Sequence, residues 1–482
     1  MYMELSFASL QFVLFFALCV ITVAGARRLG TQKWLLISFS CLFYVSFGVA
    51  GVIVLILMAA ADFCVSLRLA SSLGAEARKR WLWAGIVANV GPLALLKYST
   101  FLSASAARIL NPLGLQLSVS GDFGLHIIGL SYFTFSGMSY ILDVYYESIQ
   151  PSESLSEFLL YLIYFPKLIA GPIVRAGDLL PRLRSGVQFS AENIEIGCAY
   201  FLVGAVKKLV IADQLAPHVS MIFAAPQQYN AATLVQGVIG YTVQIYADFS
   251  GYSDMAIGCA RIMGLKFPQN FLMPYSSVNI AEFWRRWHVT MSNWFRDYVF
   301  LPLEMGSREM RNTNVRIARN MVLTMLLCGL WHGAGWNFVV WGVVHGVALA
   351  VYLVYANSKP RQMGQRARWA AFPRLLGARV LTLSVVMLGW VFFGAATVRT
   401  AFTYLWRMLT GAGDGVALES SYIVPFAALM VLAHLLVNKE RNLVEELPTH
   451  SVPVRVVTYA CLLLAVTSLV PAEPVPFVYV QF

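Results

Sequence analysis

Apolar runs of about 20 residues recur along almost the whole length of this 482-residue chain. Each run is long enough to cross a hydrocarbon core of about 30 Å as a helix. Charged residues make up only 12% of the chain, against roughly 25% in soluble domains. These features predict an all-α polytopic membrane protein embedded in a lipid bilayer. The long alternating pattern that is typical of an outer-membrane barrel does not occur.

The net charge of +11 does not indicate a nucleic-acid partner. The basic residues fall mostly in short loops between apolar runs, where they set the orientation of membrane helices. The seven cysteines are scattered, and no C-x-x-C spacing occurs. Neither a zinc site nor a disulfide framework is therefore predicted.

The first apolar run, residues 6–26, follows Glu4 and precedes Arg27 and Arg28. A secretory signal has the opposite charge order, so we expect a retained helix with its N-terminus outside. The basic run 78–80 falls on the same side as Arg27 and agrees with this orientation. We count ten to twelve spans, together with re-entrant or interfacial helices. They leave no room for a soluble domain, so residues 1–482 are predicted to form a single membrane domain.

Two later runs contain breaks. Residues 158–174 are interrupted by prolines and glycine, which predicts a kink. Residues 234–264 form a long apolar stretch that is interrupted by a polar segment, 248–254. Lys207, Lys208 and Arg175 are interpreted as interfacial charges.

Residues 282–346 contain three of the seven histidines and six of the twelve tryptophans. Placed on one helix, residues 283–298 collect five apolar or aromatic side chains within an arc of about 80°. Arg285 falls on the opposite side and His288 on a seam. This pattern favours an interfacial or re-entrant helix. A plain interfacial anchor is the alternative, although it gives no reason for His288.

The segment around His332 is harder to explain by packing alone. Residues 320–333 supply only about 14 residues, near 21 Å, before a Gly-Ala-Gly break. His332 is therefore predicted to lie below the membrane surface at a broken helix, with Trp331 and Trp336 beside it. An ionisable group at this depth is a functional-site hypothesis by default. A packing role is the alternative, and for His345 both roles stay open.

Acyl transfer to a hydroxyl would suit this site. A neutral imidazole could take the proton of an alcohol as that alcohol attacks a thioester carbonyl. Trp331 Nε1–H, Asn337 or a backbone N–H at the break could then stabilise the oxyanion. No serine-hydrolase or zinc-protease motif occurs. Two histidines without nearby Asp or Cys ligands are weak evidence for a metal, and none is predicted.

These residues resemble the membrane-bound O-acyltransferases, and within them the bacterial alginate O-acetyltransferase-like branch. The resemblance rests first on residues 282–298 with 331–346. Matching segments also occur at 132–135 with 140–145, 165–166 with 170–172, 207–208 with 212–213, and 246–256. The likeness covers residues from about 95 to 350. Residues 1–94 and 351–482 are then peripheral helices.

The resemblance implies a ring of tilted helices around a central tunnel in which donor and acceptor meet from opposite membrane faces. It implies that His332 is the catalytic histidine and that His288 is the second histidine of this branch. The residues that we expect to line the tunnel or contact substrate are Trp331, Asn337, Tyr246, Asp248, Ser250, Asp254, Trp287, Arg285 and His345.

The resemblance also implies a bacterial inner-membrane location, with the N-terminus periplasmic and no bound cofactor. Relatives take acetyl from a cytoplasmic donor, acetyl-CoA or an acyl-carrier thioester. A periplasmic or membrane-anchored acetyltransferase then places it on a polysaccharide, beside the synthesis and export machinery. A related protein moves D-alanine onto teichoic acid.

One departure from the branch leaves donor and polymer open: residues 301–308 replace a Gly-Gly-Asn-Arg turn. We place this loop at the cytoplasmic mouth, where Arg308, Arg311 and Arg316 could meet donor phosphates.

Two other classes of function stay open. A transporter could use buried histidines as a proton relay, with Asp248 and Asp254 in an apolar run. It predicts a duplicated half-chain pattern, which we do not find. A scaffold for a secretion complex would leave acetylation to a partner.

Overall fold

The computed structural model describes most of the chain, and the account below concerns these residues. They are 5–115, 127–307, 313–358, 368–411, 413, 415–418, 422–436, 442–470 and 475–478, with the backbone alone at 368–372. Their regular structure is helical, and the β-contact found among them is an isolated bridge between Tyr229 and Val416. The all-α prediction is therefore confirmed. The chain forms two compact units, each described by itself.

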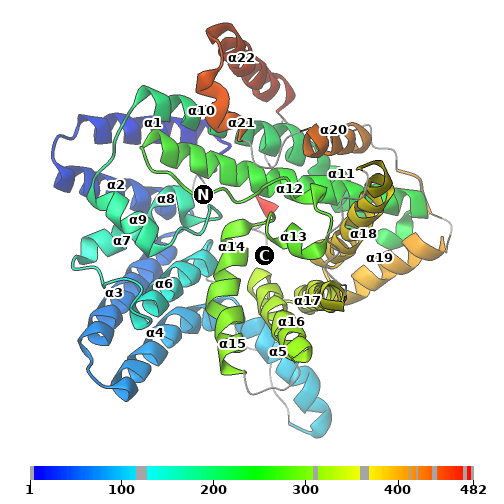
Figure 1. The fold of residues 1–482 in the computed structure, drawn as a ribbon, viewed down its shortest axis with the longest axis horizontal. Helices are drawn as coiled ribbons and strands as arrows, with labels where there is room; N and C mark the ends of the chain where they lie inside the picture. The colour runs from blue at the N-terminus through cyan, green and yellow to red at the C-terminus, as the bar shows by residue number, and fades with distance from the viewer. Residues whose placement is uncertain are drawn as a thin grey trace. The chain divides into compact units, whose positions relative to one another are not determined.

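The first unit comprises the described residues of Met1–Phe201 and Tyr252–Pro268. Within it α3, α4 and α6 lie side by side (Figure 1). The predicted kink is confirmed, since α7 ends at Ile163 and only one short helix follows before residue 176. The helices of this unit are α1 (Leu10–Gly25), α2 (Leu29–Val45), α3 (Val49–Ser71), α4 (Ala75–Leu96), α5 (Ser99–Leu110), η1 (Asn111–Leu113), α6 (Leu130–Tyr145), α7 (Leu155–Ile163), α8 (Phe165–Leu168), α9 (Ala176–Arg184) and most of α10 (Ala191–Ala205).

The second unit comprises the described residues of Leu202–Gly251 and Gln269–Phe482 and contains all three histidines singled out above. Its helices are η2 (Val206–Ala212, a π-helix), α11 (Asp213–Ala224), η3 (Pro226–Gln228), most of α12 (Ala231–Ile262), η4 (Pro274–Ser276), α13 (Ile280–Trp284), α14 (Val289–Phe295), η5 (Arg296–Phe300, a π-helix), α15 (Leu301–Gly306), α16 (Thr313–His332), α17 (Trp336–Ser358), α18 (Arg368–Gly394), α19 (Val398–Thr410), α20 (Ile423–Leu436), α21 (Leu443–Glu446), η6 (Leu447–Thr449) and α22 (Val452–Leu469).

Four helices of the described chain are long and apolar enough to cross a bilayer. They are α3, α17, the part of α18 from Pro373, and α22. A fifth span results if α4 and the helix that follows it, bent by 71°, are counted together. Several apolar helices thus fit a membrane protein, while the count of ten to twelve spans and the tunnel stay predictions.

Helix α12 runs unbroken from Ala231 to Ile262, through the polar segment 248–254 that interrupts the apolar stretch. Asp248 is buried there, but its carboxylate pairs with the ammonium of Lys208 at 2.7 Å. A paired carboxylate can stay inside a packed helix without disrupting it. Lys208 is itself buried in the protein rather than facing solvent.

Helices α16 and α17 pack side by side and carry His332 and His345 (Figure 1). Glycines make the close approach possible: a Cβ on Gly329 would lie 2.2 Å from the carbonyl oxygen of Phe338. A Cβ on Gly342 would lie 2.3 Å from the carbonyl oxygen of Met325. Small residues at a helix contact allow two backbones to approach this closely.

Candidate active site

His288 lies between two short helices. A single helix over residues 283–298 was predicted, and this prediction is wrong. Helix α13 ends at Trp284, and His288 has left-handed backbone angles, φ 43° and ψ 55°, before α14 begins at Val289. This conformation is costly for a residue with a Cβ, by about 1–3 kcal/mol, and persists only where its surroundings impose it.

Asn270 imposes the turn at His288. Its backbone oxygen accepts from Val289 N–H at 2.9 Å, and its Oδ1 accepts from the Thr290 hydroxyl at 2.9 Å. On the other side of the turn, Leu272 N–H donates to the Arg286 carbonyl at 2.9 Å. The segment around Asn270 thus runs along the turn and fixes it from both sides.

The imidazole of His288 is completely buried among aromatic rings. Its ring centroid lies 4.5 Å from that of Phe249, 6.4 Å from Phe271 and 6.1 Å from Trp331. Within the described ranges neither of its ring nitrogens has a hydrogen-bond partner. Burial lowers the pKa of His288 below its ordinary value. The ring is therefore neutral and keeps one nitrogen lone pair for a proton.

His332 is the last residue of α16, so the predicted break at Gly333-Ala334-Gly335 is confirmed. A Cβ on Gly333 would lie 2.1 Å from the ring of Phe338, which explains glycine at this position. The helix begins at Thr313 rather than near residue 320. Its 20 residues correspond to about 30 Å, so the short-helix argument for the depth of His332 is wrong even though the break is right.

Three aromatic rings surround His332, whose side chain is buried. The centroid distances are 4.7 Å to Trp331, 4.9 Å to Trp341 and 5.1 Å to Phe393. Trp336, which we expected beside His332, is instead 48% exposed. Trp341, five residues further along α17, is buried and packs its ring on His332.

His345 lies one turn beyond Trp341 on the same helix. Its ring is fully buried, 4.9 Å from Trp341 and 5.2 Å from Trp284. Like His288, it lacks a hydrogen-bond partner for either ring nitrogen among the described residues. Gly389 of α18 packs directly against it, since a Cβ there would lie 2.5 Å from Nε2. This enclosure favours a packing role for His345.

Trp331 connects the two histidines singled out for catalysis. Its ring centroid lies 6.1 Å from that of His288 and 4.7 Å from that of His332. We call His288, Trp331, His332, Trp341 and His345 the histidine–tryptophan cluster. Segments far apart in the chain thus bring two histidines next to one indole.

The remaining predicted site residues have different surroundings. Trp287 is buried beside the cluster, 5.0 Å from Phe271 and 4.9 Å from Trp390 of α18. Tyr246 packs 6.4 Å from Trp287. Ser250 is fully buried, with no hydrogen-bond partner for its hydroxyl among the described residues.

Three expected site residues are not brought to the cluster within the second unit. Arg285 is exposed. Asn337 is buried, but its amide donates to the carbonyl oxygens of Phe392, at 3.4 Å, and Ala395, at 3.1 Å. Both amide hydrogens are thus used to hold the end of α18 and are not available for an oxyanion. Asp254 belongs to the first unit.

His434 and the aromatic residues of α18 were not identified from the sequence. His434 of α20 is buried, with its ring 5.1 Å from Tyr246 and 5.5 Å from Tyr275. Its Nδ1 lies 2.8 Å from the Met430 carbonyl and therefore carries the hydrogen. Its only sequence signal is a histidine inside an apolar run.

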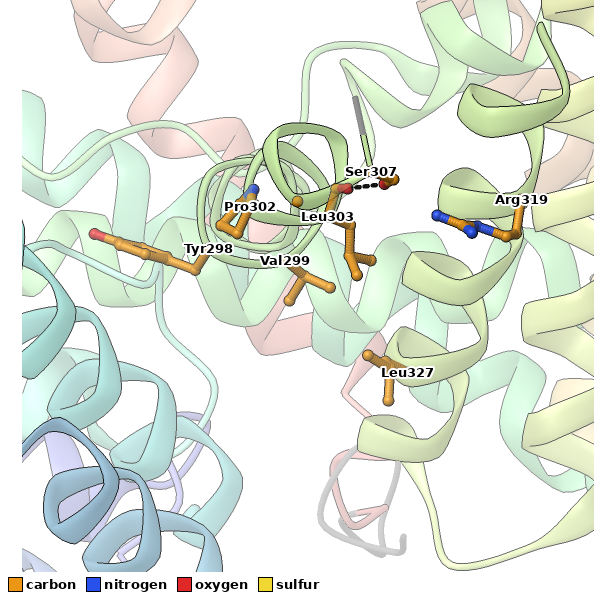
Figure 2. Close-up of a pocket in the computed structure, with 8 residues that line it drawn as sticks. Tyr298, Val299, Pro302, Leu303, Ser307, Arg319 and Leu327 are labelled. Atoms are coloured by element: carbon orange, nitrogen blue, oxygen red, sulfur yellow. Dashed lines mark hydrogen bonds between the residues drawn. The ribbon is translucent and has the colours of Figure 1, made fainter. Parts of the chain in front are cut away.

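The donor mouth can be described in part. Arg308 and Arg311 lie outside the described residues, and Arg316 is paired with Glu304 at 3.1 Å. A cavity of about 630 Å³ opens between η5–α15 and α16. Figure 2 shows Val299 and Leu303 on one side of it, with Arg319 and Leu327 of α16 on the other.

Arg319 gives this mostly apolar cavity its charge. Its guanidinium donates to Asn320 Oδ1 at 2.9 and 3.0 Å, and no carboxylate of the described residues pairs with it. The cavity therefore suits a ligand with an apolar arm and an anionic group.

The described part of the chain contains no group of three or more His, Cys, Asp or Glu side chains placed to hold a metal ion.

Comparison with known proteins agrees with the geometry. A family model described as MBOAT, membrane-bound O-acyltransferase family, matches residues 124–409. The chain is 37% identical to a probable alginate O-acetylase AlgI of Azotobacter vinelandii, over 72% of this chain and 66% of that protein. It is 31% identical to a peptidoglycan O-acetyltransferase of Helicobacter pylori, over 81% and 76%. It is 27% identical to a teichoic acid D-alanyltransferase of Bacillus subtilis, over 64% and 76%. The chain thus spans just under two thirds of the Azotobacter relative.

Proposed function

Because the chain belongs to the membrane-bound O-acyltransferase family, we propose that it is an O-acyltransferase acting on a cell-surface polysaccharide. In this proposal the acyl group is acetyl and comes from a cytoplasmic thioester, acetyl-CoA or an acyl-carrier protein. It crosses the membrane toward polymer hydroxyls by way of a periplasmic or membrane-anchored acetyltransferase. The location is the bacterial inner membrane, with the N-terminus periplasmic and the polysaccharide synthesis and export machinery nearby.

The observation that carries the proposal is the contact of both His288 and His332 with the ring of Trp331. Acyl transfer to a hydroxyl needs a neutral base next to the reacting carbonyl. An apolar, aromatic enclosure keeps imidazole neutral and excludes water that would hydrolyse a thioester. The cluster supplies both conditions.

His332 is assigned as the base. Its imidazole takes the proton of the acceptor hydroxyl while the hydroxyl oxygen attacks the thioester carbonyl carbon. Trp331 Nε1–H or a backbone N–H at the α16–α17 break stabilises the resulting oxyanion. The carbonyl re-forms as the carbon–sulfur bond breaks, and the imidazolium returns its proton to the thiolate. His288, whose ring also packs beside Trp331, is the second base.

The cavity beside α15 is proposed as the entry of the donor. Its volume of about 630 Å³ lies within the range of small-molecule sites, about 300–1,000 Å³. A pantetheine arm is apolar enough for the walls formed by Val299, Leu303 and Leu327, and its phosphate suits Arg319. Arg316 is an unsuitable phosphate ligand here, since Glu304 already neutralises it.

D-alanyl transfer from a carrier protein is the second candidate. The likeness to a protein named teichoic acid D-alanyltransferase favours it. The replacement of the Gly-Gly-Asn-Arg turn at residues 301–308 also leaves the donor open.

The test uses the purified chain in lipid nanodiscs with labelled acetyl-CoA, an acetylated carrier protein or a D-alanylated carrier protein. We expect donor-dependent thiol release and labelling of an added acceptor or partner acetyltransferase. Labelling from the D-alanyl carrier alone would identify the second candidate. Solute or proton flux in liposomes without any thioester, and no labelling from all three donors, would support a transporter instead.

A further inference from the structure

Three charged side chains that the proposed reaction does not use form a buried triad. Lys208 Nζ of the π-helix η2 lies 2.7 Å from Asp213 Oδ1 of α11 and 2.7 Å from Asp248 Oδ1 of α12. The three side chains are at most 6% exposed. A buried ion pair adds little stability by itself, so its presence calls for another explanation.

The triad is completed by a segment from far along the chain, residues 475–478. The ammonium of Lys208 forms ion pairs with Asp213 and Asp248, and it donates a hydrogen bond to the carbonyl oxygen of Val475 at 3.0 Å. In return, Val478 N–H donates to Asp248 Oδ2 at 2.8 Å. Without this segment, one ammonium donor and one carboxylate oxygen would be buried and unsatisfied, at a cost typical of charged groups.

Only backbone atoms of the segment take part in these two bonds, and its side chains are packed in the protein interior. Phe477 and Val478 are each 7% exposed. The Phe477 ring lies 5.9 Å from Phe249, and Phe249 lies 4.5 Å from the ring of His288. The segment is therefore one aromatic ring away from a proposed base.

A second contact brings the end of α22 to the same helix that carries Asp213. Gln214 Nε2 donates to the carbonyl oxygen of Leu469, the last residue of α22, at 2.8 Å. Helix α22 also packs against the π-helix η2. The chain is thus attached on both sides of the undescribed residues 471–474.

We propose that Lys208, Asp213 and Asp248 form a clamp that positions residues 475–478 behind Phe249 and thereby fixes the ring of His288 for acyl transfer. The three are positioning residues, and Asp248 is reassigned from lining the tunnel to this role. The clamp rests on the contacts above, and its effect on turnover rests on the proposed function.

The first test measures amide hydrogen exchange of residues 475–478 in nanodiscs for wild type, Lys208→Met and the size-preserving Asp248→Asn. We expect the Val478 amide to exchange about tenfold faster or more in both variants. Lys208→Met removes the hydrogen bond to the Val475 carbonyl oxygen, and Asp248→Asn replaces the charged acceptor of Val478 N–H with a neutral amide. Lys266→Met, which removes an exposed lysine, is the matched control and should leave exchange unchanged. Wild-type exchange at Val478 in both clamp variants would overturn the clamp.

The second test measures acyl transfer by the same variants and by Phe477→Ala, which removes the ring but keeps both backbone bonds. We expect kcat to fall about tenfold or more at unchanged donor KM in all three, since a displaced base costs turnover and not donor binding. Faster exchange with wild-type kcat would overturn the link to His288. If wild type itself transfers nothing, the proposed function fails while the exchange result still decides the clamp.

Discussion

Substituting Gly342→Ala should separate α16 from α17 next to His332, the proposed base. The added Cβ would lie 2.3 Å from the Met325 carbonyl oxygen and 3.1 Å from Leu326 Cα, both backbone atoms of α16. Ordinary contact begins at 3.4 Å, so the two backbones have to move apart by about 1.1 Å. Trp341, the residue before Gly342, packs on His332 and would move with it.

The magnitudes follow from this displacement. Overpacking a tight contact costs about 1–3 kcal/mol of stability. The gain in helix propensity from Gly to Ala, about 1 kcal/mol, offsets part of that cost. A displacement of about 1 Å at a reacting group can lower turnover about 10²-fold. We therefore expect a large loss of turnover with a small loss of stability.

The control is Gly377→Ala in α18, where the added Cβ would have no atom of the described residues within 4 Å beyond its own stretch of helix. This variant should keep wild-type turnover and gain slightly in thermal stability. Both variants are compared by acyl transfer at saturating donor and by thermal unfolding in the same detergent. If Gly342→Ala turns over like Gly377→Ala, the α16–α17 contact does not position His332 and the reasoning is refuted.

Three further predictions concern His288 and the donor cavity. His288→Gly and His288→Ala should both lower acyl transfer by about 10²–10⁴-fold. The glycine variant should be about 1 kcal/mol more stable than the alanine variant in thermal unfolding, because φ at this position is 43°. Equal stabilities of the two variants would contradict the backbone strain. Because burial lowers the pKa of His288, the unfolded state binds more protons below pH about 6.5, and wild type should lose up to about 1.4 kcal/mol per pH unit as the pH falls. His288→Gln should lose less, and parallel stability–pH curves would count against this. Arg319→Met should raise the KM for acetyl-CoA about tenfold or more at unchanged kcat, while the control Lys266→Met should leave this KM unchanged. An unchanged KM in Arg319→Met would place the donor outside this cavity.

The break at His332 was predictable and the break at His288 was not, for a physical reason. Gly333 and Gly335 indicate the break after His332 in the local sequence. No glycine or proline lies between residues 283 and 298, so local pattern favours one helix there. The turn at His288 is imposed by Asn270, a contact that only the folded chain reveals.

A polar interruption of an apolar run does not mark a helix end in α12. The helix continues through Asp248, whose carboxylate pairs with Lys208 and accepts from Val478 N–H. The aromatic residues of α18 that line the cluster, Trp390 and Phe393, lie beyond the motifs on which the sequence resemblance rests, in an ordinary apolar run. The environments of these residues depend on contacts with residues far apart in the sequence, which the periodicity of apolar residues does not predict.

The central claim is that His332 carries acyl transfer inside the membrane. The most direct measurement is donor-dependent transfer from labelled acetyl-CoA by purified wild type, His332→Ala and His332→Gln in nanodiscs, with folding verified by thermal unfolding. The account predicts a loss of about 10²-fold or more in both variants at unchanged donor binding. Transfer by a folded His332→Ala variant at the wild-type rate would contradict it.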